Sequence, residues 1–217
     1  MDTGNKGLDQ SRHNPAAGNS QFNATVTPQK DAPPQETPEV QNTGKIKEMK
    51  EWQYKRDAMN RYFTSLGYTN INVNQKTFCE DAYGRERVSR LPDGSNRNKL
   101  TTDATARLMM EIVTAKAVTP QRSAQMMELL KRDYTGTSKD ADDQSHGFTG
   151  IALTGIEGAR LWSKAGWTST TRHDVVYLEL PNGSRFVLAT FTTDHANERE
   201  IIPTVARVVI EGIASVK

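Results

Sequence analysis

Two strand-like runs joined by a turn signal constrain the fold of this chain more than any other feature of its sequence. The first run, VVYLEL, begins at Val175, and the second, RFVLATF, begins at Arg185. The segment PNGS (181–184) lies between them. Asn-Gly is the strongest short hairpin signal because both residues tolerate positive φ. The pattern predicts a β-hairpin over residues 175–191, preceded by a further strand that contains the run LWS.

Apolar residues recur at three- to four-residue spacing in several other segments, which predicts amphipathic helices. One covers residues 45–66 and ends at Gly67. Thr102 is placed to cap a second helix. Thr119 is placed to cap a third, with Pro120 at the favoured first position. These elements are separated by polar segments, at 68–99 and 134–147, which are predicted to be loops.

The chain is predicted to end in a helix over residues 197–215, with Pro203 tolerated in its first turn. Helices that precede an antiparallel strand set, followed by a terminal helix, indicate an antiparallel sheet with helices packed on its faces. The predicted fold class is therefore α+β, with three layers in the order α/β/α.

Residues 1–44 differ in composition from the rest of the chain. They contain five of the nine prolines, and Phe22 is their only aromatic residue. Such a segment cannot bury enough apolar surface to offset the entropy of ordering it, so it is predicted to be a disordered tail. The folded domain is predicted to be residues 45–217.

Charge and cysteine content exclude some classes of function. The chain has 28 basic and 26 acidic residues, interspersed, for a net charge of +2, which argues against a nucleic-acid partner. The single cysteine, Cys79, excludes an internal disulfide and is interpreted as a small core residue. No apolar run is long enough to cross a membrane, and no signal peptide is evident. The four histidines lack metal-ligand spacing, so we expect no metal and no cofactor.

The tripeptide Lys164-Ala165-Gly166 continues the strand-like run LWS. A lysine, a small residue and a glycine on a strand can bring backbone N–H groups close to a ligand. This segment resembles the Lys-Thr/Ser-Gly strand of the class A β-lactamase and penicillin-binding serine hydrolase superfamily. The resemblance extends over about residues 46–213, with TSLGYTNINVNQKTFCEDAYGRE similar to the family's Ω-loop region and LTTDATARLMMEIV similar to the helix after it.

The resemblance implies roles for individual residues. Lys164 would position a substrate carboxylate and a catalytic hydroxyl, and Trp167 would lend its backbone N–H to the oxyanion hole. Gly166 and Thr168 complete the implied substrate-binding strand. Ala165 stands where the family usually has a hydroxyl residue, which removes one hydrogen bond to the substrate and favours a divergent hydrolase.

Acidic residues of the Ω-loop-like region are candidates for the family's general base, which activates the deacylating water. Glu80 is the first candidate, and Asp81 and Glu86 compete with it; a solvated loop acid is the alternative. Near the N-terminus, Ser20 and Asn23 lie in a segment similar to the family's Ser-Asp-Asn motif, with one residue inserted.

The family's nucleophile lies in a Ser-x-x-Lys motif, which does not occur in these 217 residues. The chain is therefore expected to be either a fragment or an inactive homologue. Its substrate would be a β-lactam or peptidoglycan-like small molecule. The alternative is a non-catalytic module that binds peptidoglycan-type carboxylates. We expect a monomer; members of the family are usually periplasmic or secreted.

A different catalytic arrangement, a Ser-His-Asp triad, was weighed for the segment Arg172-His173-Asp174, with Ser163 or Ser169 as the nucleophile. Adjacent residues of a strand point to opposite faces, which argues against it. The segment is interpreted as a turn at the entry to the strand.

Overall fold

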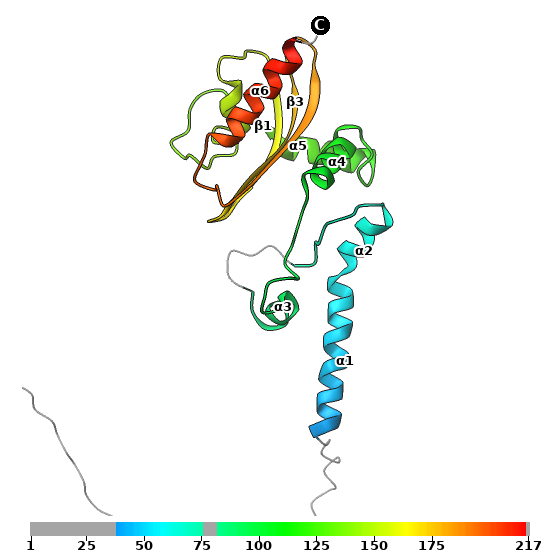
Figure 1. The fold of residues 1–217 in the computed structure, drawn as a ribbon. Helices are drawn as coiled ribbons and strands as arrows, with labels where there is room; N and C mark the ends of the chain where they lie inside the picture. Colours follow the sequence, from blue (N-terminus) through cyan, green and yellow to red (C-terminus); the bar gives the residue numbers. More distant parts are fainter. Residues whose placement is uncertain (1–37, 76–81, 216–217) are drawn as a thin grey trace, which may run out of the picture. The chain divides into compact units, whose positions relative to one another are not determined.

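The computed structural model describes residues 38–75 and 82–215, and its central feature is a four-stranded antiparallel sheet (Figure 1). The strands are ordered β1-β2-β3-β4 across the sheet. Their bounds are β1 Lys131–Arg132, β2 Arg160–Trp167, β3 Thr171–Glu179 and β4 Arg185–Thr193. The predicted hairpin is confirmed as β3–β4, with Val175 opposite Ala189 and Glu179 opposite Arg185.

Of the two residues of the Asn-Gly turn signal, only the glycine adopts positive φ. Gly183 has φ 88°, whereas Asn182 is not among the residues with positive φ. Gly183 N donates to Leu180 O at 2.9 Å, and Leu180 N donates to Ser184 O at 2.9 Å. This is the pattern of a three-residue loop, in which a turn is followed by a left-handed glycine. Pro181 takes the first central position of the turn, which its ring geometry favours.

One face of the sheet is covered by α6 (Ile201–Ser215) and the short 3₁₀ helix η1 (Thr149–Leu153). The terminal helix thus begins four residues later than predicted, with Pro203 in its first turn as expected. The buried side chains between these helices and the sheet are Ala152, Leu153, Ala159, Leu161, Val176, Leu178, Leu180, Ala206 and Ile210.

The opposite face of the sheet is covered by α4 (Thr102–Val113) and α5 (Pro120–Leu130), so the predicted three-layer α+β architecture is confirmed (Figure 1). The core on this side consists of Met109, Trp162, Val175 and Tyr177, flanked by partly buried Val113, Met127, Leu130, Val187, Ala189 and Phe191. Successive residues of β2 and β3 therefore divide between two cores, as the two-residue period of a strand requires.

The N-terminal cap of α5 is the predicted residue, whereas the N-terminal cap of α4 differs from the prediction by one residue. Thr119 Oγ1 accepts a hydrogen bond from Arg122 N at 3.2 Å, with Pro120 at the first helical position, as predicted. In α4 the cap is Thr101, not Thr102, because Thr101 Oγ1 accepts from Ala104 N at 3.2 Å. Two adjacent threonines offer the same cap, and only the backbone geometry selects between them.

The first predicted helix is two helices, α1 (Pro38–Arg56) and α2 (Ala58–Ser65), separated at Asp57. Asp57 Oδ1 accepts from Asn60 Nδ2 at 2.6 Å, a local side-chain bond of the kind that competes with regular helix. The predicted loop 68–99 contains a further helix, α3 (Gly84–Arg90). An isolated bridge between Asn72 and Lys99 joins the two ends of this segment.

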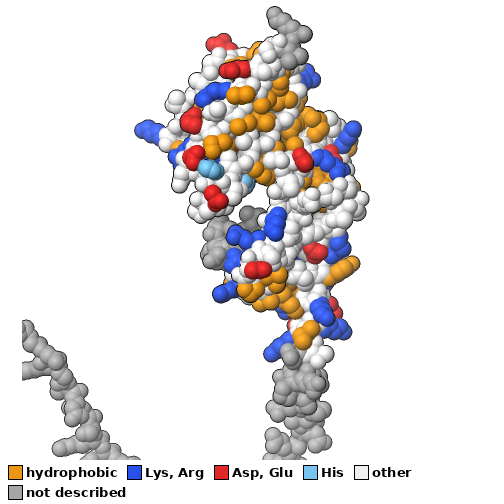
Figure 2. Space-filling model, in the orientation of Figure 1, with side chains coloured by type: hydrophobic (Ala, Val, Ile, Leu, Met, Phe, Trp, Pro, Cys, Tyr) orange, Lys and Arg blue, Asp and Glu red, His pale blue; other side chains and the backbone are white. Residues whose placement is uncertain are grey.

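Gly44–Lys217 forms one compact unit of the chain. Several residues named in the sequence analysis lie outside the described residues: Ser20, Phe22, Asn23, Cys79, Glu80 and Asp81. No helix within the described part of the chain is long and apolar enough to cross a membrane. Acidic and basic side chains are interspersed over the face drawn in Figure 2.

Candidate functional site

Along its second half, the outer edge of β2 is bonded by side chains rather than by a neighbouring strand. β1 pairs only with Leu161 and Trp162, so the backbone from Ser163 onward has no strand on that side among the described residues. Arg132 Nη2 donates to Ser163 O at 2.8 Å, and Ala165 N donates to Gln144 Oε1 at 3.2 Å. Backbone groups two residues apart on a strand point the same way, so Trp167 N–H points toward this edge as well.

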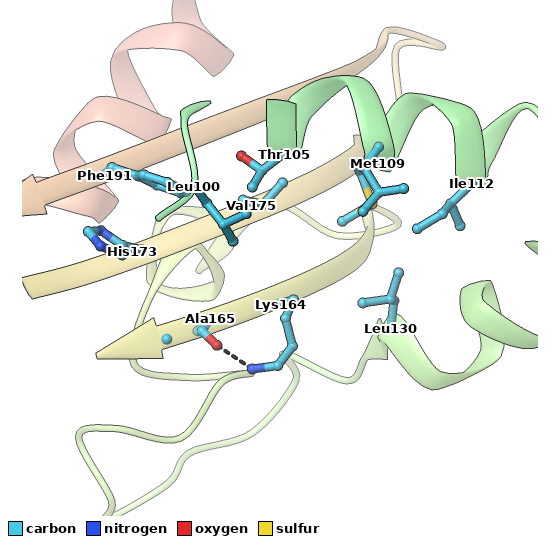
Figure 3. Close-up of a pocket in the computed structure, with 12 residues that line it drawn as sticks. Leu100, Thr105, Met109, Ile112, Leu130, Lys164, Ala165, His173, Val175 and Phe191 are labelled. Atoms are coloured by element: carbon cyan, nitrogen blue, oxygen red, sulfur yellow. Dashed lines mark hydrogen bonds between the residues drawn. The ribbon is translucent and has the colours of Figure 1, made fainter. Parts of the chain in front are cut away.

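Lys164 lies at this edge with its ammonium group close to the backbone. Lys164 Nζ donates to Gln144 Oε1 at 3.3 Å and also to Ala165 O (Figure 3). Partial burial of the side chain and the nearby charge of Arg132 lower the pKa of Lys164, and the negative charge of Asp174 opposes them. Oxygen acceptors therefore surround the Lys164 amine, and a bound anion would stabilise its charged form.

A largely apolar pocket of about 390 Å³ adjoins Lys164. It lies between α4 and the sheet, and in Figure 3 the side chains of α4 face those of β2, β3 and β4 across it. The lining residues are Leu100, Thr105, Leu108, Met109, Ile112, Leu130, Lys164, Ala165, Gly166, His173, Val175 and Phe191. Apolar walls with a few convergent polar groups are typical of small-molecule sites.

His173 is the second ionisable side chain of this pocket, after Lys164. Its ring stacks on Phe191 with centroids 4.2 Å apart, and its Nδ1 accepts from Thr192 N at 3.3 Å. Because a backbone N–H can only donate, Nδ1 carries no proton and the neutral ring holds its proton on Nε2. Burial lowers the pKa of His173, which favours this neutral form.

Ser163 and Asp174 lie on the other face of the sheet and are buried, at 0% and 1% exposed. Asp174 Oδ2 accepts from Thr149 N at 3.2 Å, whereas Asp174 Oδ1 and Ser163 Oγ have no partner among the described residues. Burial raises the pKa of Asp174 to about 6. His173 points to the opposite face, so the structure does not bring a Ser-His-Asp triad together.

The segment Arg172-His173-Asp174 belongs to β3 itself, which begins at Thr171, so its interpretation as a strand-entry turn was wrong. Arg172 is 2% exposed and its Nη1 donates to Asp142 Oδ1 at 2.6 Å. Its Nη2 donates to Ala141 O at 3.1 Å and Gly147 O at 2.8 Å. A charged side chain is thus buried within a strand because the loop 133–148 supplies its partners.

The remaining predicted site residues have varied surroundings. Gly166 lines the pocket, and the Trp167 ring packs on Phe148 with centroids 5.6 Å apart. Thr168 Oγ1 accepts from Thr171 N at 3.0 Å and stabilises the β2–β3 turn. Glu86, one alternative for the general base, pairs with Arg56 at 2.9 Å.

Gln144 and Arg132 were missed by the sequence analysis, although both contact the β2 edge. Gln144 lies in the long loop after α5, and Arg132 lies in the two-residue strand β1. Neither residue belongs to a motif, so no sequence signal identifies them. Across residues 38–75 and 82–215, no group of three or more His, Cys, Asp or Glu side chains is arranged to hold a metal ion.

The fold and the β2 edge together define a domain of the serine β-lactamase type. Residues 52–213 match the beta-lactamase enzyme family, and the chain belongs to that family. No curated protein matches the chain.

Two solved structures illustrate the similarity of fold. The first is the β-lactamase from Sphaerobacter thermophilus DSM 20745, with a TM-score of 0.54 and 22% identity over 75% of this chain and 55% of that one. The second is a PBP-A mutant in an acyl-enzyme complex with penicillin G, with a TM-score of 0.50 and 18% identity over 72% of this chain and 51% of that one. The chain thus spans little more than half the length of either structure.

Proposed function

We propose that this chain forms the carboxylate-binding part of a β-lactamase-type acyl-transfer site. The substrates are β-lactams or related peptidoglycan-like amides and esters. The observation that carries the proposal is the convergence of two donors at the edge of β2, Lys164 Nζ and Ala165 N–H, on a single oxygen atom, Gln144 Oε1. A cation beside a backbone N–H is a strong arrangement for binding a carboxylate.

Within the proposed site, Lys164 supplies the positive charge and Gly166 permits close approach of the ligand to the strand. The N–H of Trp167 points toward the same edge and donates to a carbonyl oxygen as negative charge develops on it. The adjoining apolar pocket receives the uncharged part of the ligand. Glu80 remains the proposed general base; Ser20 remains a proposal for a proton relay, and Asn23 for a contact with the substrate amide.

A covalent step needs an activated nucleophile close to its base. No Ser-x-x-Lys motif is present in these residues, and Ser163 is buried on the face opposite Lys164. We propose that this chain alone binds ligand without forming an acyl adduct. The same observation favours a second candidate, a non-catalytic module that binds peptide or glycan carboxylates.

Calorimetry with benzylpenicillin tests the binding proposal. Lys164→Met is expected to weaken binding at least tenfold, as expected for loss of a charge-assisted bond. Lys139→Met removes an exposed lysine of the loop and serves as the matched control, with binding unchanged. Equal binding by wild type and Lys164→Met, or no binding by either, would rule out the carboxylate site.

Intact-mass spectrometry after exposure to benzylpenicillin distinguishes the remaining possibilities. Reversible binding with no added mass is the expected result. A stable acyl adduct on any serine contradicts the proposal that the chain alone lacks covalent activity. Saturable binding of peptidoglycan fragments without binding of penicillin favours the non-catalytic module.

A further inference from the structure

The side chain of Gln144 is positioned like a bound ligand at the edge of β2. Its Oε1 accepts from Ala165 N at 3.2 Å and from Lys164 Nζ at 3.3 Å. The atom facing Ala165 must be the amide oxygen rather than the nitrogen, since a backbone N–H can only donate. One neutral oxygen thus takes the bonds that a carboxylate oxygen would receive there.

The loop 133–148 holds Gln144 in this position from both sides. On the N-terminal side, Asp142 pairs with the buried guanidinium of Arg172 at 2.6 Å. On the C-terminal side, Asp143 Oδ1 accepts from Ser145 N at 2.7 Å and from His146 N at 3.0 Å. Gly147 N donates to Asp143 O at 2.7 Å, which closes the turn around Gln144. The glutamine is therefore presented to β2 by an anchored backbone.

We propose that Gln144 is a built-in competitor for the carboxylate-binding edge of β2, displaced when a ligand carboxylate binds. The amide keeps the Ala165 N–H and the Lys164 ammonium paired when no ligand is bound, as buried donors require. The bond from the Lys164 ammonium to the Gln144 amide is already charge-assisted, whereas the bond from Ala165 N–H is neutral. A carboxylate would turn the first into an ion pair and make the second charge-assisted, which is roughly twice as strong as a neutral bond. The neutral Gln144 side chain is thus displaced by an anion but not by an uncharged amide or ester.

Gln144 thereby sets specificity for anionic ligands. A ligand that lacks a carboxylate would exchange one neutral acceptor for another and gain little. This inference rests on the proposed carboxylate site and adds the residue that competes for it. A glutamate at the same position would form a permanent ion pair with Lys164 and would block the edge.

NMR titration of the ¹⁵N-labelled full chain with sodium acetate, following the Ala165 amide signal, tests the inference without any β-lactam. Gln144→Ala is expected to bind acetate about three- to tenfold more tightly than wild type, the effect of removing one neutral hydrogen-bond competitor. Gln144→Glu is expected to bind acetate more weakly than wild type, by a factor at least as large. Gln121→Ala, on the exposed side of α5, is the control and should match wild type.

Thermal melting of each variant shows whether it retains the fold, and the two Gln144 variants change acetate affinity in opposite directions, which loss of structure cannot do. Equal acetate affinity in wild type and both variants, or no acetate binding by any of them, overturns the inference. Acetate binding that follows the expected order without penicillin binding means that the proposed substrate is wrong and the Gln144 competitor stands. Penicillin binding of equal strength in wild type and both Gln144 variants means that the carboxylate site stands and the Gln144 competitor is wrong.

Discussion

The buried guanidinium of Arg172 on β3 pairs with the partly exposed Asp142 in the loop 133–148, with Nη1 and Oδ1 2.6 Å apart. The guanidinium also lies over the Phe148 ring, 3.8 Å from its centroid. Arg199 approaches the second carboxylate oxygen of Asp142 at 3.3 Å. The pair therefore ties the loop that carries Gln144 to the centre of the sheet.

Asp142→Ala should destabilise the protein, because it leaves the Arg172 guanidinium buried with only carbonyl acceptors. The expected loss in the free energy of unfolding is about 2 to 3 kcal/mol, below the full cost of an unpaired buried charge because Asp142 is partly exposed. Urea unfolding monitored by tryptophan fluorescence measures it. Lys139→Ala, in the exposed part of the same loop, should cost less than about 1 kcal/mol. Equal losses would show that the ion pair contributes nothing specific.

The hairpin and the strand that carries Lys164 were predictable because their signals are local. Strand alternation and the PNGS turn define the hairpin within residues 175–191, and Lys164 follows the run LWS directly. The predicted separation of His173 from Ser163 and Asp174 is likewise a property of any strand. The three-layer fold followed from the order of such elements.

Contacts that bring distant segments together were not predictable. Gln144 reaches Ala165 across 21 residues, and Arg132 reaches Ser163 across 31, so neither contact has a sequence pattern. β1 is only two residues long, too short for any alternation to be visible. The charged Arg172 suggested a turn because its ion-pair partner, Asp142, lies 30 residues away.

The ionisation of Asp174 should give the protein a specific pH dependence. Because burial raises its pKa to about 6 from an ordinary value of 3.8, the folded state binds more protons than the unfolded state between these values. The free energy of unfolding therefore falls as pH rises through this window, and between pH 4.5 and 7.5 this group accounts for about 2 kcal/mol of the fall. Asp174→Asn keeps an acceptor for Thr149 N and should remove that fall. Urea unfolding at pH 4.5 and 7.5 compares the two proteins, with Glu211→Gln as the control. An unchanged pH difference in Asp174→Asn refutes this assignment.

Substitution of Gly150 tests the tight packing between η1 and the loop 133–148, and substitution of Gly212 is its matched control. A Cβ on Gly150 would lie 1.7 Å from Ser145 O, whereas a Cβ on Gly212 meets nothing within 4 Å. Gly150→Ala should therefore destabilise the fold by about 3 kcal/mol through forced backbone movement. Gly212→Ala, inside α6, should stabilise it by about 0.5 to 1 kcal/mol. Thermal melting measures the loss of stability in Gly150→Ala and the gain in Gly212→Ala. An unchanged melting temperature in Gly150→Ala would show that Gly150 and Ser145 O are not in tight contact in solution.

His146 should make the order of the loop 133–148 depend on pH. Its Nε2 lies 3.0 Å from Thr135 O and its Nδ1 lies 3.1 Å from Asp143 Oδ1, so both contacts are hydrogen bonds only when the ring is doubly protonated. The Thr135 carbonyl and the Asp143 carboxylate raise the pKa of His146 against the effect of burial. A raised pKa means that the stabilisation is fully present below the ordinary value of about 6.5 and is lost as pH rises through the folded value.

Amide exchange at Gly147, corrected for the intrinsic pH effect, should therefore show protection that declines above neutral pH in wild type. His146→Gln cannot carry the charge, so its protection should be lower at pH 6 and should not change with pH. His195→Gln is the matched control, because His195 pairs with Glu198 at 2.6 Å outside this loop. Its Gly147 protection should follow wild type. A decline in protection that persists in His146→Gln would place the titrating group elsewhere.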